Sequence, residues 1–293
     1  MSNAQGFEAA ASQSETVAEF DDHRRGFVAK FQHFLHQTPA AVSLIVLLTA
    51  IPIFGLLIDF EPLLYSFGMA ELEEISNSRY RFFSLRTLSF ILEQVMIVGI
   101  VGAAQALVIL TAGIDLSVGA IMVFSSVVMG QFTFRYGLPV ELAIVCGLAV
   151  GTFCGFINGV LVARVKLPPF IVTLGMWQIV LATNFLYSAN ETIRSQDIAA
   201  EAPLLQIFGT TIKVGADETG RGGTNFTLGV MFMVLLVLVL AYVLRQTAWG
   251  RHVYAVGDDP EAAELSGVKV KRVLISVYML SGLICAFAGW ALI

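Results

Sequence analysis

Seven long apolar runs, separated by shorter polar segments, dominate the hydrophobic pattern of the 293-residue chain. A helix needs about 20 mostly apolar residues to cross the hydrocarbon core of a bilayer, and each run approaches or exceeds that length. The runs cover residues 40–58, 88–112, 116–134, 140–163, 169–189, 226–244 and 272–293. The pattern predicts an all-α fold, a polytopic transmembrane helix bundle with about seven spans, whose last run is still apolar at Ile293.

The polar segments divide the chain into a tail and a membrane domain. Residues 1–39 lack the apolar core and cleavage site of a signal peptide, so we expect an N-terminal tail. Residues 40–293 form the membrane domain, with an outer loop at 190–225 that can hold a short helix around 197–207, and an inner loop at 245–271. Ten of the 17 lysine and arginine residues lie on the side of the N-terminus, in shorter loops than the other seven. The positive-inside rule therefore places the N-terminus in the cytoplasm.

Composition supports a membrane protein and excludes several classes of function. The chain is 57% hydrophobic and 13% charged, with a mean hydropathy of +0.79, whereas soluble domains carry about 25% charged residues. A net charge of −5 gives no indication of a nucleic-acid partner. The cysteines and histidines lack the spacing of metal ligands, and the sequence contains no phosphate-binding loop or nucleophile elbow. We therefore expect no enzyme activity, no metal and no cofactor in this chain.

A polar break separates the second and third apolar runs. Asp115 and Ser117 lie there, between Gly113 and Gly119, and glycine permits a helix to stop and restart. An ionisable residue is costly at bilayer depth. One interpretation is that Asp115 and Ser117 cap the next helix at the membrane surface. The other is that the break lines a water-filled path or acts as a hinge, because irregular backbone is tolerated where it borders a cavity. Both interpretations can hold together.

A second polar feature lies within the run at 88–112. Glu93 and Gln94 stand near its outer end, and Gln105 follows Gln94 by 11 residues, about three helical turns, so the two amides share one face. Such a stripe can line a solute path. It can equally join neighbouring helices, since amides form hydrogen bonds across membrane bundles.

Small residues at every fourth position mark one face of the run at 140–163. They are Gly147, Gly151, Gly155 and Gly159. This spacing allows another helix to approach closely, so the ridge is interpreted as structural.

The inner loop at 245–271 is a polar island with the signals of a short helix. Asp259 fits the N-cap, Pro260 the first helical position, and Glu261 complements the positive helix end. Gly267 fits the C-terminal cap. The signals predict a helix over 260–266 that presents Ala262, Ala263 and Leu265. So short a helix needs a surface to pack on. That surface is either its own bundle or a groove on a cytoplasmic partner.

Four motifs together resemble the permease subunits of ribose/xylose-type monosaccharide ABC importers, the inner-membrane translocator family. They are Thr111–Gly119, Asn158–Gly159, Leu167–Gly175 and Gly250–Ala263. The resemblance covers residues 85–293 and keeps the order and spacing of the motifs. It differs at Gly257-Asp258-Asp259, where the family usually has Gly-Gly-Asn, a change that still allows helix capping. Members of the family continue for several more spans, so we expect the chain to be incomplete at its C-terminus.

The resemblance implies a set of partners. A homodimer with a second permease copy would bind cytoplasmic ATP-binding subunits, and a periplasmic sugar-binding protein would dock on the outer face, where 190–225 is the periplasmic loop. The loop at 245–271 would contain the coupling helix. The coupling residues would be Gly250, Arg251, Tyr254, Gly257, Asp259, Pro260, Glu261, Ala262, Ala263, Leu265 and Gly267. ATP hydrolysis would take place on the separate subunit.

The resulting hypothesis is a bacterial inner-membrane permease that moves a monosaccharide by alternating access. The candidate path or hinge residues are Glu93, Gln94, Gln105, Gly113, Asp115, Ser117 and Gly119. Two alternatives stay open: a gradient-driven secondary transporter, and a truncated fragment that does not transport. The scarcity of titratable residues inside the spans argues against the first. The sequence does not specify the sugar.

Overall fold

The computed structural model describes residues 31, 34–35, 38–58, 85–189, 191–216 and 222–293. The chain divides into two compact units, residues 1–84 and 85–293. Within the first unit the main described element is α3 (Pro39–Ile58), a helix that continues through Pro52 and matches the run predicted at 40–58. Most of the predicted tail, 1–39, lies outside the described residues.

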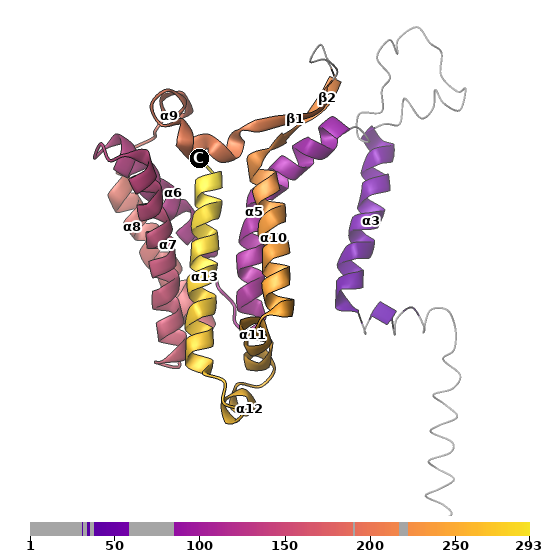
Figure 1. Cartoon of the computed structure of the whole chain (residues 1–293), viewed down its shortest axis with the longest axis vertical. Helices are drawn as coiled ribbons and strands as arrows, with labels where there is room; N and C mark the ends of the chain where they lie inside the picture. Colours follow the sequence, from indigo (N-terminus) through magenta and orange to yellow (C-terminus); the bar gives the residue numbers. More distant parts are fainter. Residues whose placement is uncertain (1–30, 32–33, 36–37, 59–84, 190, 217–221) are drawn as a thin grey trace, which may run out of the picture. The chain divides into compact units, whose positions relative to one another are not determined.

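Six long helices form the bundle of the second unit (Figure 1). They are α5 (Leu85–Ile109), α6 (Val118–Phe134), α7 (Val140–Ala163), α8 (Pro169–Ser188), α10 (Leu228–Gln246) and α13 (Val270–Ala291). Among the described residues, five helices are long and apolar enough to cross a membrane, namely α5 from Thr87, α7, α8, α10 and α13. The apolar stretches of α3 and α6 are shorter, at 41–57 and 118–134. The prediction of an all-α, polytopic membrane fold is confirmed.

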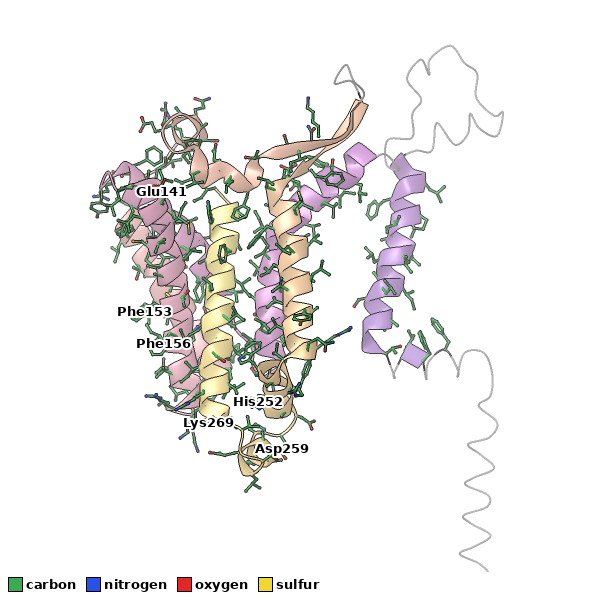
Figure 2. The ribbon with its side chains drawn as sticks, in the orientation of Figure 1. Glu141, Phe153, Phe156, His252, Asp259 and Lys269 are labelled. Carbon is green, nitrogen blue, oxygen red and sulfur yellow. The ribbon has the colours of Figure 1, made fainter. Side chains whose placement is uncertain are left out.

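The bundle has an apolar belt between two polar ends. Phe153 and Phe156 project outward from the middle of α7, whereas Glu141 lies at one end and Asp259 at the other (Figure 2). Phe153 remains 60% exposed, although it is a large apolar side chain. Such exposure is unfavourable in water and is what a bilayer-facing surface requires.

Helix α13 lies at the centre of the bundle because glycines let α7 approach it closely. A Cβ at Gly151 would lie 2.7 Å from the Cβ of Ala286, and a Cβ at Gly155 would overlap the carbonyl oxygen of Tyr278. On the α13 side, a Cβ at Gly282 would overlap the carbonyl oxygen of Gly151. The small residues on α7 are therefore structural, as predicted, and α13 is the most buried of the five spans.

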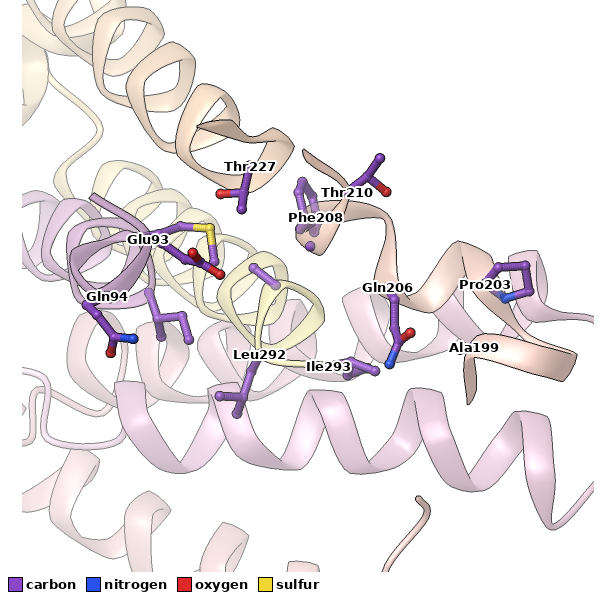
Figure 3. A pocket seen from close by; sticks show the side chains of 14 residues that line it. Glu93, Gln94, Ala199, Pro203, Gln206, Phe208, Thr210, Thr227, Leu292 and Ile293 are labelled. Carbon is purple, nitrogen blue, oxygen red and sulfur yellow. The ribbon is translucent and has the colours of Figure 1, made fainter. Parts of the chain in front are cut away.

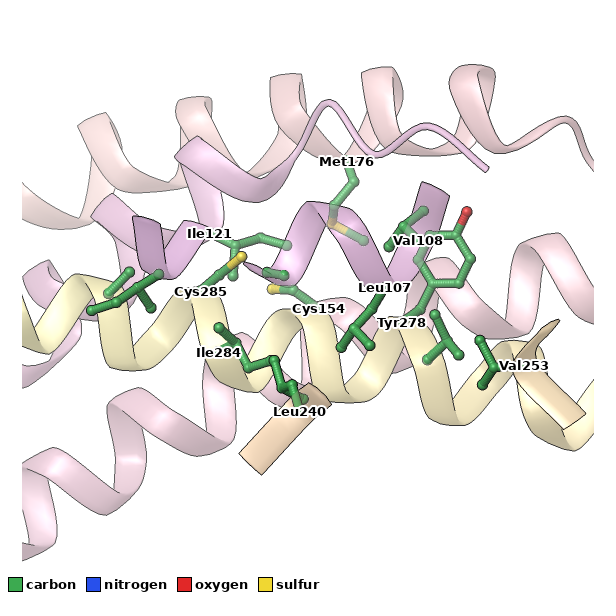
Figure 4. Packing of buried hydrophobic residues seen from close by; sticks show 14 of the residues in the cluster. Leu107, Val108, Ile121, Cys154, Met176, Leu240, Val253, Tyr278, Ile284 and Cys285 are labelled. Atoms are coloured by element: carbon green, nitrogen blue, oxygen red, sulfur yellow. The ribbon is translucent and has the colours of Figure 1, made fainter. Parts of the chain in front are cut away.

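The buried apolar cluster combines side chains from most of the bundle (Figure 4). Leu107 and Val108 of α5, Cys154 of α7 and Tyr278 of α13 meet in it. Among the described residues, Tyr278 is the largest side chain that is fully buried. Because the cluster reaches the last turns of α5, the end of that helix is held by the core rather than by the loop that follows it.

One end of the bundle, called here the α9 end, carries the connection between α8 and α10. It contains α9 (Ser195–Glu201), the 3-10 helix η1 (Pro203–Gly209), and strands β1 (Thr211–Ala216) and β2 (Gly222–Thr227). The helix predicted around 197–207 is thus found as two short helices. The antiparallel β-hairpin was not predicted; it pairs Thr211 with Thr227. The Trp290 indole donates to the carbonyl oxygen of Leu204 at 3.3 Å and fastens η1 to α13.

The opposite end, called here the α12 end, carries the segment between α10 and α13. This segment forms two helices, α11 (Ala248–Asp258) and α12 (Pro260–Leu265), of which only the second was predicted. The linker 110–117 between α5 and α6 lies at the same end, beside α11 (Figure 1). The α12 end therefore brings together the polar island and the polar break, which are more than 120 residues apart in the sequence.

Candidate coupling site

The ends of α12 are formed by the residues that the sequence indicated. The Asp259 carboxylate accepts hydrogen bonds from the N–H groups of Glu261 at 2.9 Å and Ala262 at 3.1 Å. Gly267 adopts φ +87°, and the N–H of Val268 donates to the carbonyl oxygen of Ala263 at 3.0 Å. These contacts are an N-cap and a Schellman C-cap, so the predicted cap residues are confirmed.

Of the two alternatives for the surface on which α12 packs, the structure shows its own bundle, and only for one face of the helix. Ala263 is only 4% exposed and packs in the main core cluster, so it is not presented outward as predicted. Ala262 is exposed, and Leu265 is 90% exposed. A leucine this exposed at a polar end of the bundle, outside the apolar belt, offers a contact for another surface. The inner face fixes α12 to the bundle, and the outer face stays accessible.

Helix α11 is amphipathic and carries the rest of the predicted coupling residues. Gly250, Val253 and Val256 are buried at a spacing of three, a helical pattern that the sequence contained. Arg251 and Tyr254 face outward. Sequence reasoning missed α11 because it treated the whole island as a loop around one short helix.

Two side-chain hydrogen bonds hold the start of α11. The Thr247 hydroxyl accepts from the N–H of Gly250 at 3.2 Å and forms the N-cap. The Trp249 indole donates to the Ser276 hydroxyl on α13 at 2.8 Å. Neither Thr247 nor Trp249 was a predicted site residue.

The break between α5 and α6 is an irregular linker with one strained residue. Ala112 adopts φ 56°, the left-handed conformation that non-glycine residues rarely adopt. Gly113 is required for close packing, since a Cβ there would lie 2.8 Å from the Tyr278 hydroxyl oxygen. Gly119 is exposed and a Cβ would meet nothing within 4 Å, so no contact among the described residues requires glycine there.

Asp115 stabilises the linker. The prediction that it caps α6 is wrong. Its carboxylate accepts from the N–H of Ser117 at 2.8 Å and from the Ser117 hydroxyl at 2.6 Å. Ser117 occupies the N-cap position, yet its side chain makes no capping bond to α6. Asp115 lies outside the spanning helices; burial raises the pKa of its carboxyl above the ordinary value, and the two bonds from Ser117 oppose the rise.

Helices α7 and α8 hold the linker from the side through two residues that sequence reasoning did not assign to the site. The Asn158 amide donates to the Ser117 hydroxyl at 3.0 Å. The Thr173 hydroxyl accepts from the N–H of Leu116 at 3.1 Å. Asn158 and Thr173 are both fully buried, and the bond between Asn158 and Ser117 is protected from water. The motifs at 111–119, 158–159 and 167–175 thus meet in one hydrogen-bonded cluster.

The polar residues of α5 are divided between two places. Glu93 and Gln94 are exposed and line a cavity of about 600 Å³ at the α9 end, together with Gln206, Phe208 and Thr227 (Figure 3). Gln105 is on the same helix but does not line this cavity. Its amide oxygen is buried without a partner among the described residues. The stripe predicted along α5 is therefore not continuous. In the described part of the chain, no group of three or more His, Cys, Asp or Glu residues is placed to hold a metal ion.

The fold defines a multi-pass membrane protein with two short helices, α11 and α12, at one end of its bundle. Residues 87–293 match the family described as the permease component of branched-chain amino acid transport systems, and the chain belongs to this family of inner-membrane permeases. The membrane bundle described above is therefore that of a transport protein.

Curated relatives of the chain are sugar import permeases. It is 61% identical over 290 residues to the fructose import permease protein FrcC of Rhizobium meliloti, covering 99% of this chain and 73% of that protein. It is 34% identical to the ribose import permease protein RbsC of Bacillus subtilis (strain 168), covering 68% of this chain and 58% of that protein. For RbsC of Escherichia coli (strain K12) the identity is 31%, with 73% and 63% covered. The chain thus spans about three fifths of the length of these ribose permeases. No solved structure matches it.

Proposed function

We propose that this chain is the membrane-spanning permease subunit of an ATP-driven importer and that its substrate is a monosaccharide, with fructose the first sugar to test. The observation that carries the proposal is 61% identity to a fructose import permease across 99% of this chain. Sugar moves by alternating access between the two ends of the bundle, within a complex that contains a second permease copy.

The α12 end faces the cytoplasm in this proposal, with the N-terminus on the same side. Basic residues at this end support the orientation, among them Lys269, which Figure 2 places beside α12. A cytoplasmic ATP-binding subunit binds the exposed face of α11 and α12, and Leu265 inserts into a groove of that subunit. This is the helix-in-groove mode, in which one apolar side chain anchors a short helix. Hydrolysis of ATP takes place on that subunit.

The α9 end is then the periplasmic face, where a sugar-binding protein delivers the substrate. The cavity of about 600 Å³ is the outer vestibule of the path, and its size suits a monosaccharide. Glu93 and Gln94 supply hydrogen-bonding groups for sugar hydroxyls there. At the opposite end, Gly113, Asp115 and Ser117 shape the hinge beside the path.

Uptake of labelled fructose by the native host tests the proposal, because the host supplies every partner in its natural form. Deletion of the gene should abolish high-affinity fructose uptake, and the intact gene should restore it. An unlabelled sugar that competes better than fructose would replace fructose as the substrate. Uptake that survives the deletion would refute the proposed function. Uptake that stops with an uncoupler while cellular ATP is held constant would identify a gradient-driven transporter instead.

Docking through α12 is tested by Leu265→Asp, with Val165→Asp as the matched control. Val165 is also exposed, at 55%, and lies in the linker between α7 and α8 at the same end of the bundle. We expect Leu265→Asp to abolish uptake and the co-purification of an ATP-binding subunit, and Val165→Asp to retain both. Normal co-purification with Leu265→Asp, at an equal amount of protein in the membrane, would exclude α12 as the docking element.

A further inference from the structure

The last turn of α11 touches the polar break directly, backbone against backbone. A Cβ at Gly257 would overlap the carbonyl oxygen of Leu110 and would lie 3.4 Å from the Cα of Thr111. No side chain separates the two segments at this point. A displacement of α11 therefore reaches the linker without being absorbed by a flexible side chain, which distinguishes this contact from ordinary side-chain packing.

α11 and α12 form a single mechanical unit. Only Asp259 separates Asp258, the last residue of α11, from Pro260, the first of α12, and the same Asp259 caps α12. The unit is seated on the bundle by Val253 and Val256, which are 0% and 1% exposed and share a core cluster with Leu107 and Val108 at the end of α5. A force applied at the exposed face of α12 is thereby transmitted to the end of α5 and to the linker.

The opposite side of the linker is attached to α7 and α8. Ser117 forms a hydrogen bond with Asn158, and Leu116 forms one with Thr173, as described above. Between these attachments and Gly257 lies a segment without regular secondary structure, which contains the strained Ala112. An irregular segment held at both ends can change its dihedral angles, and so behave as a hinge, without breaking a helix.

Buried polar groups beside the linker could form hydrogen bonds with it if it moved to a second position. The side-chain oxygen of Asn158 and the hydroxyl of Tyr278 are buried and have no hydrogen-bond partner among the described residues. The first belongs to the residue that binds Ser117, and the second lies beside Gly113. Buried polar atoms without partners cost free energy, so a shifted linker that supplies those partners is stabilised.

From this geometry we infer that the linker 110–117 is the element that the α11–α12 unit moves during transport, and that Gly257 is the positioning residue through which it does so. The inference rests on the proposed function, since the moving force is the ATP-binding subunit acting on α12. Sugar recognition at the α9 end does not depend on this contact. The contact therefore controls the rate of transport and leaves the apparent affinity for sugar unchanged.

The test uses Gly257→Ala, with Gly102→Ala as its control. Gly102 lies in the middle of α5, where a Cβ would meet nothing within 4 Å. Overpacking against a rigid backbone in Gly257→Ala should lower the Vmax of fructose uptake about tenfold at unchanged KM. Gly102→Ala should match the parent in both constants. A Vmax of Gly257→Ala equal to that of the parent, with equal protein in the membrane, would overturn the inference.

A labelling experiment keeps the inference testable if Gly257→Ala does not accumulate in the membrane. Ile114, 52% exposed, is replaced by Cys in a chain that carries Cys146→Ser, and inside-out vesicles from the native host are treated with a maleimide. We expect the labelling rate of Ile114→Cys to change severalfold when ATP and vanadate are added, while that of Val165→Cys stays constant. If Gly257→Ala does accumulate, adding it should remove the change, and adding Gly102→Ala should preserve it.

The outcomes separate the inference from the function on which it rests. If cells with the parent chain do not take up fructose or a competing monosaccharide, the proposed function fails. If they do, and the labelling rate of Ile114→Cys is the same with and without ATP and vanadate, the function stands and the inference fails. A nucleotide-dependent change that persists with Gly257→Ala would also overturn the role of Gly257.

Discussion

Removing the carboxylate of Asp259 should loosen α12 and leave the membrane bundle intact. In Asp259→Ala, the N–H groups of Glu261 and Ala262 lose the acceptor that they share, at 2.9 and 3.1 Å. Both groups lie in the first turn of a helix of six residues. Because the helix is short, intrahelical hydrogen bonds in its first turn cannot replace the two bonds lost with the carboxylate.

The size of the effect follows from the two hydrogen bonds and from their exposure. Replacing an N-cap aspartate by alanine costs about 1 kcal/mol. Both bonds are exposed, and water can occupy the vacated positions, so the loss should not exceed this value. A free energy of about 1 kcal/mol corresponds to a factor of about five in the equilibrium between closed and open forms of the first turn.

Hydrogen–deuterium exchange of the peptide that contains residues 260–267 measures this factor. In Asp259→Ala its exchange should be about fivefold faster, and exchange in α13 should be unchanged. Asp258→Ala is the matched control, since Asp258 is the adjacent exposed aspartate and its side chain does not cap α12. Equal exchange of the peptide in the parent and in Asp259→Ala would refute the assignment of Asp259 as the N-cap. So would equal acceleration by both substitutions.

Substitutions at three further sites, with their controls, test the bundle, α11 and the linker. Gly155→Ala places a Cβ against the backbone of α13 and should cost about 1–3 kcal/mol, seen as a lower unfolding temperature in detergent; Gly175→Ala, where a Cβ meets nothing, should be neutral. Trp249→Phe removes the indole hydrogen bond between α11 and α13 and should speed exchange in α11, at a cost of about 0.5–1.5 kcal/mol. Unchanged hydrogen–deuterium exchange in α11 would show that this hydrogen bond does not stabilise the helix. Asp115→Asn keeps an acceptor and should preserve thermal stability, whereas Asp115→Ala should cost about 1–3 kcal/mol; equal stability of the two would contradict the linker geometry.

Local features of the chain were predictable because their signals are contained within a few residues. The membrane helices follow from runs of apolar residues, and the observed boundaries of α7 and α8 agree with the predicted ones to within one residue. The N-cap, the proline and the closing glycine of α12 are likewise local, and all three occupy the predicted positions. Each of these signals acts through backbone hydrogen bonds between near neighbours.

Other features were present in the sequence but were interpreted too coarsely. Helix α11 has buried residues at helical spacing, yet its polar residues led to its interpretation as part of a loop. The hairpin of β1 and β2 lacks a long apolar pattern, and its strands pair with each other at the polar α9 end. In both cases a weak periodicity becomes a defined element only when the bundle supplies a surface beside it.

The sequence by itself determined that the chain enters a membrane and where a short capped helix interrupts its apolar helices. About seven spans were predicted, whereas five helices among the described residues are long and apolar enough to cross a membrane and the apolar stretches of two others are shorter. Only the tertiary structure decided that Asn158 and Thr173 hold the polar break, and that Gly257 touches it. It also decided that Ala263 faces inward while Leu265 faces outward. The physical reason is the range of the interactions. Helix formation and capping are settled within one or two turns, whereas the partners of the break lie more than 40 residues away, and only the close packing of glycine-bearing helices brings them together.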